Sequence, residues 1–540
     1  MIDNTKALNL NIQTIINQIY EDEKRLSEGE KVSDIALKIP QIDSGEDKRS
    51  GLGHKLARQL FPAKDEDRIG SYIAYGRLLA RLRRAYKSQI AEANANNSQV
   101  DPYRQARMFG DRHIFDQLLS APLSDSILNP QAMPVEVAPY QELEPFFTHM
   151  KKGKPADRPC QEFTRGAYYD DGRIDMCKQV VGDLYIGNLV ESIRENPYVE
   201  HFLLGNNIVG DEGASKIASL ASDRSTPRIK TYYLAGNCLT EKGAAELADA
   251  LVGDRHAESL WLKRNPLKAG GVACIAKMLE QNTSLQTLDL VNVGMLDEGV
   301  KVLFASLRKN HTLRTLYIDA NGISETGASY IAEYFEYMKS ENWKGLTGLF
   351  MAINRLGDAG AELIANAVAG YSHLSKLDLS SNRIQNAGLK VLLEKCNTLP
   401  ELVYLGIGLY KSTSDMGELP NYFDGCGAEL IADFIRSNNT VQIFGLMDTN
   451  IREGGFEIIA DALEKNHTLL DLQYQQFRSQ LPQELEARIR SLLARNIQEQ
   501  LGMSVQKFHS SLKREIKHSD QIRFIDSIYR NNMKDCHICV

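Results

Sequence analysis

The sequence predicts an α/β fold of stacked strand–helix units, and two periodic features predict it. The first is a phrase, Gly-Ala-x-x-[Ile/Leu]-Ala or a close variant, whose glycines are 30, 28, 28, 28, 33, 28, 39 and 28 residues apart. These glycines are Gly213, Gly243, Gly271, Gly299, Gly327, Gly360, Gly388, Gly427 and Gly455. A repeat at a nearly fixed period is typical of proteins that stack their units into one array.

The second feature lies just before each glycine. Most units carry an Asn six residues before the Gly, namely Asn207, Asn237, Asn265, Asn321, Asn354 and Asn382. Apolar residues alternate before each Asn, as Leu260 and Leu262 do, which indicates a short strand with a buried face. An Asn side chain both donates and accepts, so it can satisfy backbone groups in the turn after the strand. Three units have Val293, Tyr410 or Thr449 at this place.

A helix should complete each unit. The stretch 243–251, for example, carries apolar residues at helical spacing, and its opening Gly-Ala pair allows close packing on the neighbouring helix. One unit cannot bury its own apolar face, whereas stacked units share a continuous core.

The whole pattern, L-x-x-L-x-L-x-x-N-x-L followed by a helix, resembles the leucine-rich repeat of the ribonuclease-inhibitor type over residues 199–480. This resemblance implies a curved leucine-rich-repeat solenoid, with parallel strands on the inside and helices on the outside. We expect α-helical N- and C-terminal segments to flank it, and after Pro482 we predict helices over 483–500 and 504–531. The expected domains are a helical N-terminal domain (1–125), a Pro-rich linker or cover (126–170), the solenoid (171–480) and a helical C-terminal segment and tail (481–540).

Composition excludes several classes of protein. The 540 residues are 43% hydrophobic and 25% charged, with a net charge of −7, which is ordinary for a globular chain. No apolar run approaches the ~20 residues that span a bilayer. The first 25 residues have the pattern of an amphipathic helix, not of a signal peptide. Eight Cys are too few for a disulfide scaffold, so we expect a cytoplasmic protein; a bacterial protein exported without a cleaved signal would look the same.

The usual sequence signatures of catalysis are missing from the chain. It contains no G-x-x-x-x-G-K-[ST], H-E-x-x-H or G-x-S-x-G motif. We therefore predict a protein that is not an enzyme, with no catalytic residue, cofactor or metal. Cys536 and Cys539 form a C-x-x-C near the end of the sequence, but a structural zinc needs four ligands, and we interpret the two as free thiols.

A basic cluster lies between Lys48 and Lys87. It has 11 Lys or Arg and three acidic residues, a balance of +8, and Arg77, Arg81 and Arg84 share one face of a predicted helix. Such a face could bind nucleic acid through phosphates, or an acidic protein. A solvated helix face is the alternative, and no recognised nucleic-acid motif accompanies the cluster.

The most informative residues lie between the two strand leucines of each unit, because alternating side chains make these positions point away from the core. They form the row Leu203, Tyr233, Trp261, Asp289, Tyr317, Phe350, Asp378, Gly406 and Gly445. Four of the nine are aromatic, against 8% of the whole chain, so the row is strongly enriched. Aromatic residues beside Arg are typical of the energetic centres of protein interfaces.

Two interpretations of this row stay open: it binds another protein, or one of the chain's own ends covers it. We predict the first, a protein-interaction module or scaffold. Its predicted partner-binding residues are Tyr233, Trp261, Lys263, Arg264, Asp289, Tyr317, Asp319, Phe350 and Asp378.

The repeats also resemble those of the Ran GTPase-activating protein. That resemblance implies an alternative function, stimulation of GTP hydrolysis by a small GTPase. Arg264, next to Asn265, is the residue whose position best fits such a role.

Overall fold

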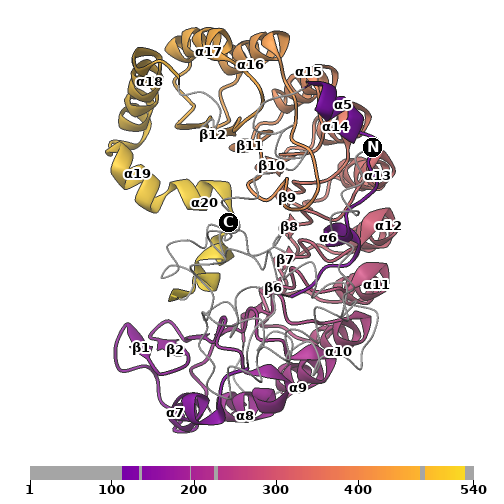
Figure 1. The fold of residues 1–540 in the computed structure, drawn as a ribbon, viewed down its shortest axis with the longest axis vertical. Coiled ribbons are helices and arrows are strands. Elements are labelled where there is room, and N and C mark those ends of the chain that lie inside the picture. Colours follow the sequence, from indigo (N-terminus) through magenta and orange to yellow (C-terminus); the bar gives the residue numbers. More distant parts are fainter. Residues whose placement is uncertain (1–111, 133–136, 195, 224–228, 475–480, 529–540) are drawn as a thin grey trace, which may run out of the picture.

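A computed structural model describes residues 112–132, 137–194, 196–223, 229–474 and 481–528. The described chain is a curved solenoid with strands on its inner side and helices on its outer side (Figure 1), which confirms the predicted fold class. The basic cluster with Arg77, Arg81 and Arg84 lies outside the described residues, as does the pair Cys536 and Cys539.

Within the described residues, thirteen short strands form one sheet in which each strand pairs with the next along the chain. β1 to β3 pair in antiparallel fashion, and the pairs from β3 to β13 are parallel. The strands are β1 (Cys160–Glu162), β2 (Ala167–Tyr169), β3 (Arg173–Asp175), β4 (His201–Leu203), β5 (Thr231–Tyr233), β6 (Ser259–Trp261), β7 (Thr287–Asp289), β8 (Thr315–Tyr317), β9 (Gly348–Phe350), β10 (Lys376–Asp378), β11 (Tyr404–Gly406), β12 (Ile443–Gly445) and β13 (Asp471–Gln473).

One helix follows each strand from β3 to β12 and lies on the outer side (Figure 1). These helices are α8 (Gly182–Arg194), α9 (Gly210–Ser222), α10 (Glu241–Leu251), α11 (Lys268–Leu279), α12 (Leu296–Leu307), α13 (Glu325–Ser340), α14 (Gly357–Val368), α15 (Asn386–Cys396), α16 (Gly425–Ser437) and α17 (Glu453–Lys465). The flanking elements are α5 (Arg112–Leu118), α6 (Asp125–Leu128) and α7 (Tyr140–Met150) before the sheet, and α18 (Gln483–Leu501), α19 (Val505–Ser511), α20 (Lys513–Lys517) and the 3₁₀ turn η3 (Asp520–Ile525) after it. Among the described helices, none combines the length and the apolar character that a bilayer span requires.

The core lies between the sheet and the helices. The middle residue of each strand points into it, as the fully buried Leu260, Leu288 and Leu316 do. The helix-opening glycines let neighbouring helices approach: a Cβ atom at Gly271 would lie only 3.2 Å from the Cβ of Ala244 in α10. A side chain there would push the two helices apart.

The six predicted asparagines form a buried ladder that joins successive repeats. The side chain of Asn265 shows the pattern: its Oδ1 accepts hydrogen bonds from the backbone N–H of Asn237 (2.8 Å) and Leu239 (3.1 Å). Its Nδ2 donates to the carbonyl of Leu234 (2.9 Å) and to that of Leu262 (2.8 Å). Each Asn thus satisfies buried backbone groups of its own repeat and of the one before it. Without hydrogen-bond partners, these buried groups would destabilise the fold.

In the eighth unit the sequence prediction is wrong, because Tyr410 does not occupy the Asn place. The insertion precedes that place, and Asn421 fills it: its Nδ2 donates to the carbonyls of Leu379 (3.0 Å) and Ile407 (2.8 Å). Its Oδ1 accepts from the N–H of Asn382 (2.8 Å). The ladder therefore continues across the insertion.

A second Asn ladder, which the sequence analysis missed, lies in the turns that precede the strands. The Oδ1 of Asn310 accepts from the N–H of Leu313 (2.8 Å), and its Nδ2 donates to the carbonyl of Leu279 one repeat earlier (2.8 Å). The recurring pattern Asn-x-[Ser/Thr]-[Leu/Val] could have revealed it. It occurs at Asn282, Asn310, Asn438 and Asn466.

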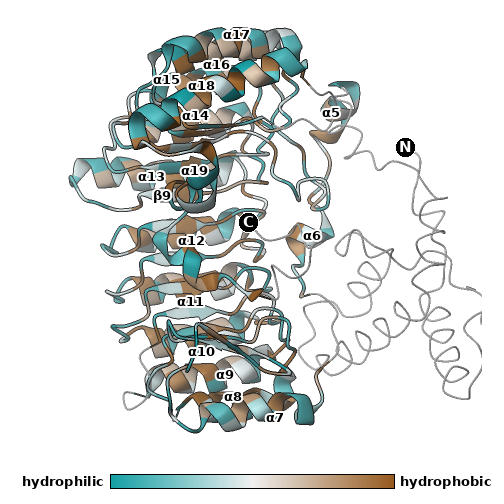
Figure 2. Ribbon diagram, turned by 90° about the vertical axis from the view of Figure 1, so that its left-hand side faces the viewer, coloured by the Kyte–Doolittle hydropathy of each residue, from teal (hydrophilic) through white to brown (hydrophobic). Residues whose placement is uncertain are grey.

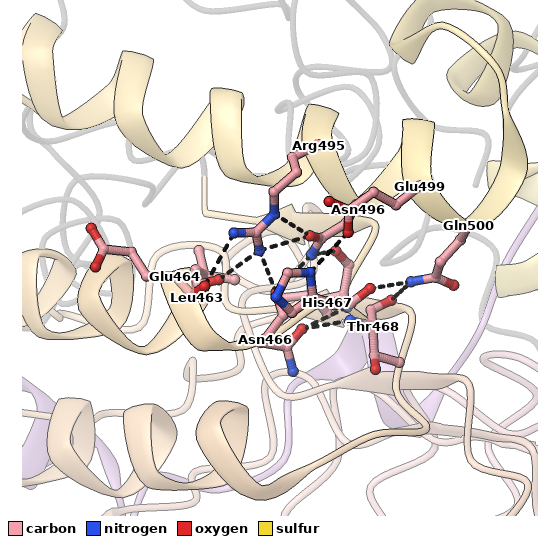
Figure 3. A network of polar contacts seen from close by, with 10 residues as sticks. Leu463, Glu464, Asn466, His467, Thr468, Arg495, Asn496, Glu499 and Gln500 are labelled. Atoms are coloured by element: carbon pink, nitrogen blue, oxygen red, sulfur yellow. Dashed lines mark hydrogen bonds and ion pairs between the residues drawn. The ribbon is translucent and has the colours of Figure 1, made fainter.

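The long helix α18 caps the last repeat, where Figure 3 shows its polar contacts. Arg495 donates to the carbonyls of Leu463 (3.1 Å) and Asn466 (2.7 Å). The neighbouring Asn496 donates to the carbonyl of Leu469 (2.8 Å). It thus satisfies a backbone group of the last turn, as the ladder asparagines do in the other repeats. The direction in which the chain leaves the stack is therefore fixed.

The helix predicted over 504–531 is wrong as a single element. The chain forms the short helices α19 and α20 and the turn η3, and it bends back into the inside of the curve (Figure 1). His518 has an extended backbone (φ −116°, ψ 179°) that interrupts the helix. This break turns the next residues toward the sheet.

A strap formed by residues 119–132 crosses the turns that leave the strands, and Figure 2 shows α5 and α6 along that edge of the stack. Its anchor is the buried carboxylate of Glu418, which pairs with Arg355 (2.7 Å) and Arg383 (2.7 Å). Arg383 also donates to the carbonyl of Leu119 (2.6 Å), and Arg355 to that of Ala121 (2.7 Å). One carboxylate thus aligns two guanidinium groups on the strap.

We predict that Asn265→Ala weakens the whole solenoid. The N–H of Asn237 and the carbonyl of Leu234 would lose buried partners, at ~1–3 kcal/mol each, so the free energy of unfolding should fall by about 3 kcal/mol. Urea denaturation followed by circular dichroism measures this. Asn366→Ala, at an exposed site on α14, is the matched control and should change little. Equal stability of the two variants would contradict the role of the ladder.

We also predict that Glu418→Gln loosens the strap. Breaking a buried ion pair costs ~3–5 kcal/mol, because the partner charges stay buried. Thermolysin should then cleave within residues 119–132 well before it attacks the repeats. The control is Glu333→Gln, which removes an exposed ion pair with Arg308 (2.9 Å) and should leave cleavage unchanged. Similar cleavage of both variants would argue against Glu418 as the anchor.

Candidate partner-binding face

The concave row predicted from the sequence exists as a continuous line of side chains. Strand pairing places Tyr233 beside Trp261, and Tyr317 beside Phe350, and the same register holds along the row from Leu203 to Gly445. The row is the third residue of each strand, and the first residue of each strand points to the same side. The prediction from the strand leucines covered only the third position.

The aromatic side chains of the row contact one another. The ring centroids of Tyr317 and Phe350 are 4.5 Å apart and nearly parallel, and those of Trp261 and Tyr317 are 5.5 Å apart. Tyr404, from the first position of β11, extends the line at 6.0 Å from Phe350. Its hydroxyl donates to Oδ2 of Asp378 (2.7 Å). This row together with Tyr404, which we call the concave wall, therefore combines aromatic rings with carboxylates. Tyr404 was not among the residues predicted from the sequence.

The C-terminal segment, residues 505–528, covers this row. Ile522 and Ile525 pack into one cluster with Tyr233, Trp261 and the other rings. The predicted ring anchors are accordingly buried, with Trp261 only 2% exposed. The expectation of an open face is therefore wrong for this conformation. The chain's own aliphatic residues exclude water from the apolar rings, and this burial lowers the free energy of the folded chain.

The carboxylates predicted to bind a partner are buried as well. Asp289 and Asp378 each cap the turn after their own strand, and Asp319 caps the turn after the next strand. Asp289 Oδ1 accepts from the N–H of Val291 (2.8 Å), and Asp378 Oδ1 accepts from that of Ser380 (2.9 Å). Asp319 Oδ1 accepts from the N–H of Ala352 (2.7 Å). Burial, followed by the nearby charge of Asp378, raises the pKa of Asp319 well above its ordinary value.

The two predicted cations lie at the edge of the row. Arg264 has a left-handed backbone (φ 59°) and donates to Oδ1 of Asn206 (3.0 Å). Its guanidinium thus spans two turns at the exit of the strands. Lys263 is half-buried beside it.

Polar contacts hold the C-terminal segment at both ends. At one end Lys513 pairs with Asp471 (2.9 Å). At the other end the hydroxyl of Ser527 donates to Oδ1 of the fully buried Asp175 (2.9 Å), and the N–H of Ile528 donates to its Oδ2 (3.1 Å). The acidic groups of the solenoid therefore receive donors from the segment.

The middle of the segment contacts the wall mainly through rings and cations. The His518 ring stacks on Phe350 with centroids 5.5 Å apart, and the Nζ of Lys517 lies 5.2 Å from the Tyr404 ring. Phe524 stacks on His201 at 4.0 Å. Burial lowers the pKa of His201 to about 4, so this ring is neutral at physiological pH.

Polar groups buried between the C-terminal segment and the concave face are less well paired in hydrogen bonds than those of the solenoid beneath. Both ring nitrogens of His518 and the Nε1 of Trp261 are buried without a hydrogen-bond partner in the described structure. Burial, followed by the nearby charges of Lys517, Arg514 and Lys376, lowers the pKa of His518 well below its ordinary value. Each unpaired buried polar group costs ~1–3 kcal/mol, so the segment is held less firmly than its apolar contacts alone would suggest.

No group of three or more His, Cys, Asp or Glu that could hold a metal is found in the described part of the chain. The arrangement of rings, carboxylates and backbone donors is suited to holding a polypeptide segment.

We predict that acid loosens the C-terminal segment through His518. Its pKa is ordinary in the released state and lowered in the docked state, so the neutral ring does not oppose docking above about pH 6.5, and docking weakens progressively as the pH falls below that value. In a Trp343→Phe background, emission of Trp261 should shift to the red between about pH 7.5 and about pH 5.

The matched variant is His518→Leu, which removes the titrating ring and should shift less. The raised pKa of Asp319 acts in the opposite sense but is common to both proteins, so their difference isolates His518. Identical pH profiles for the two proteins would contradict the prediction.

Comparison with known proteins agrees with the repeat architecture. A family model described as "Leucine Rich repeat" matches residues 195–218, 309–332 and 372–393. NACHT, LRR and PYD domains-containing protein 14 of Mus musculus is 25% identical over 248 residues, 42% of this chain and 24% of that protein. Ribonuclease inhibitor of Sus scrofa is 26% identical over 247 residues, 42% of this chain and 53% of that protein.

The chain thus spans about a quarter and about half of the length of these two relatives. Among solved structures, one described as the Rad7 and Elc1 complex in yeast is matched with a TM-score of 0.40 and 12% identity, over 76% of this chain and 90% of that one. The repeat matches and the solenoid together show leucine-rich repeats of the ribonuclease-inhibitor type.

Proposed function

We propose that this protein is a protein-interaction module whose binding surface is the concave face, and that its C-terminal segment occupies this face until a partner replaces it. Leucine-rich repeat proteins generally mediate contacts between proteins, and ribonuclease inhibitor is named for acting on another protein. These likenesses support the class of function and leave the partner open.

The observation that carries the proposal is the way in which the face holds its present occupant. Rings from β5, β6, β8, β9 and β11 receive two isoleucines and an imidazole, and carboxylates at both ends receive donors. Buried aromatic anchors surrounded by polar contacts are the usual composition of a protein interface.

The alternatives have less support. Arg264 hydrogen-bonds Asn206, and no observation on it favours the GTPase-activating alternative. Nucleic-acid binding through Arg77, Arg81 and Arg84 stays a prediction, because these residues lie outside the described residues.

We predict that a release variant, Ile522→Asp with Ile525→Asp, recovers its partner from native cells better than the wild type does. Two carboxylates cannot stay among the rings of Trp261 and Tyr233, so the segment should leave and open the face. Affinity purification with quantitative mass spectrometry measures recovery. The control is Val302→Asp, the same change at an exposed site on the outer helix α12, and it should behave as the wild type.

Dependence on the rings decides the test. Adding Trp261→Ala and Tyr317→Ala to the release variant should abolish the gain in recovery. Proteins recovered equally with and without these rings would contradict the concave face as the binding surface.

A further inference from the structure

The C-terminal segment shows which chemistry the concave face accepts. We infer that the face selects partner segments that are basic and carry two aliphatic side chains three residues apart, as the C-terminal segment itself does. This inference rests on the proposed function and specifies its ligand class.

The aliphatic requirement follows from packing. Ile522 and Ile525 lie one helical turn apart in η3, and both are buried in the cluster that contains Trp261, Tyr233 and Leu203. A spacing of three places both side chains on the same face of the turn, so one short turn fills the apolar part of the wall.

The basic requirement follows from charge. Lys513 pairs with Asp471 (2.9 Å), and the ammonium of Lys517 lies 5.2 Å from the ring of Tyr404, whose hydroxyl binds Asp378. Without these two lysines, the carboxylates of Asp471 and Asp378 would face an occupant that offers them no compensating charge. Acidic segments are therefore disfavoured, since like charges across an interface are repulsive.

The chain's own segment is an occupant that can be exchanged. Both nitrogens of His518 and the Nε1 of Trp261 stay without partners under it. A segment that accepts a hydrogen bond from Trp261, or that carries an apolar residue at the place of His518, avoids these costs and competes for the same wall. The segment therefore serves as a template for the partner and as its competitor.

The test uses a labelled peptide with the sequence of residues 512–528 and the full-length release variant Ile522→Asp with Ile525→Asp. Fluorescence anisotropy should show binding to the release variant and at least about tenfold weaker binding to the wild type, whose own segment blocks the face. A second peptide carries Lys513→Glu and Lys517→Glu, and should bind the release variant at least about tenfold more weakly than the first. A third peptide, with both isoleucines changed to Asp, should not bind.

Three outcomes would overturn the inference. The first is equal binding of the lysine and glutamate peptides, because the face would then have no preference for basic segments. The second is equal binding to the release variant with and without Trp261→Ala. The third is a wild-type chain that forms stable dimers which the release variant does not, because the occupant would then be the segment of a second copy.

The experiment separates this inference from the proposed function. If the peptides fail while partner recovery still depends on Trp261 and Tyr317, only the ligand class is wrong. If recovery is also independent of the rings, the proposed function falls with it. Circular dichroism of the release variant is the check that the solenoid is intact in either case.

Discussion

In-register stacking is the constraint on which the rest of this structure depends. Each strand of the described repeats, from β3 to β13, is three residues long and pairs residue for residue with the next, so equivalent positions of successive repeats must touch. The same rule that lines up Leu260, Leu288 and Leu316 in the core lines up the rings on the inner side. The inner row must then be either exposed to water or covered by protein. Exposing a row with this many aromatic rings to water costs free energy.

The cover comes from a part of the chain remote in sequence, and its geometry is set by the end of the stack. α18 is fixed on the last repeat by Arg495 and Asn496, and the chain beyond it turns back across the strands. The strap, held by Glu418, fixes the chain that precedes the repeats to the turns at the exit of the strands. The described parts of both flanks, residues 119–132 and 481–528, thus pack on the repeat region.

The repeat itself could be predicted from the sequence, because its evidence is local and recurs many times. The glycine spacing, the ladder asparagines and the register of the concave row all follow from patterns within one unit. Where a unit departs from the pattern, the prediction fails: counting forward from the strand gives Tyr410, because the insertion lies between the strand and the Asn place. Counting back six residues from Gly427 gives Asn421, and its hydrogen bonds confirm that it fills the place.

The cover could not be predicted in the same way. Nothing in residues 505–528 repeats, and the cluster that holds Ile522 and Trp261 joins positions separated by most of the repeat array. The sequence left internal cover open as an alternative but offered no means to choose it. Tyr404 was overlooked because only one of the two inward-facing positions of each strand was considered.

Amide hydrogen exchange of the C-terminal segment in the intact wild-type protein tests the central claim most directly. If the segment lies on the concave wall, the amides of residues 519–528 exchange far more slowly than those of a free peptide of the same sequence. Exchange at the free-peptide rate would show that the wall is open in solution, and would contradict the account.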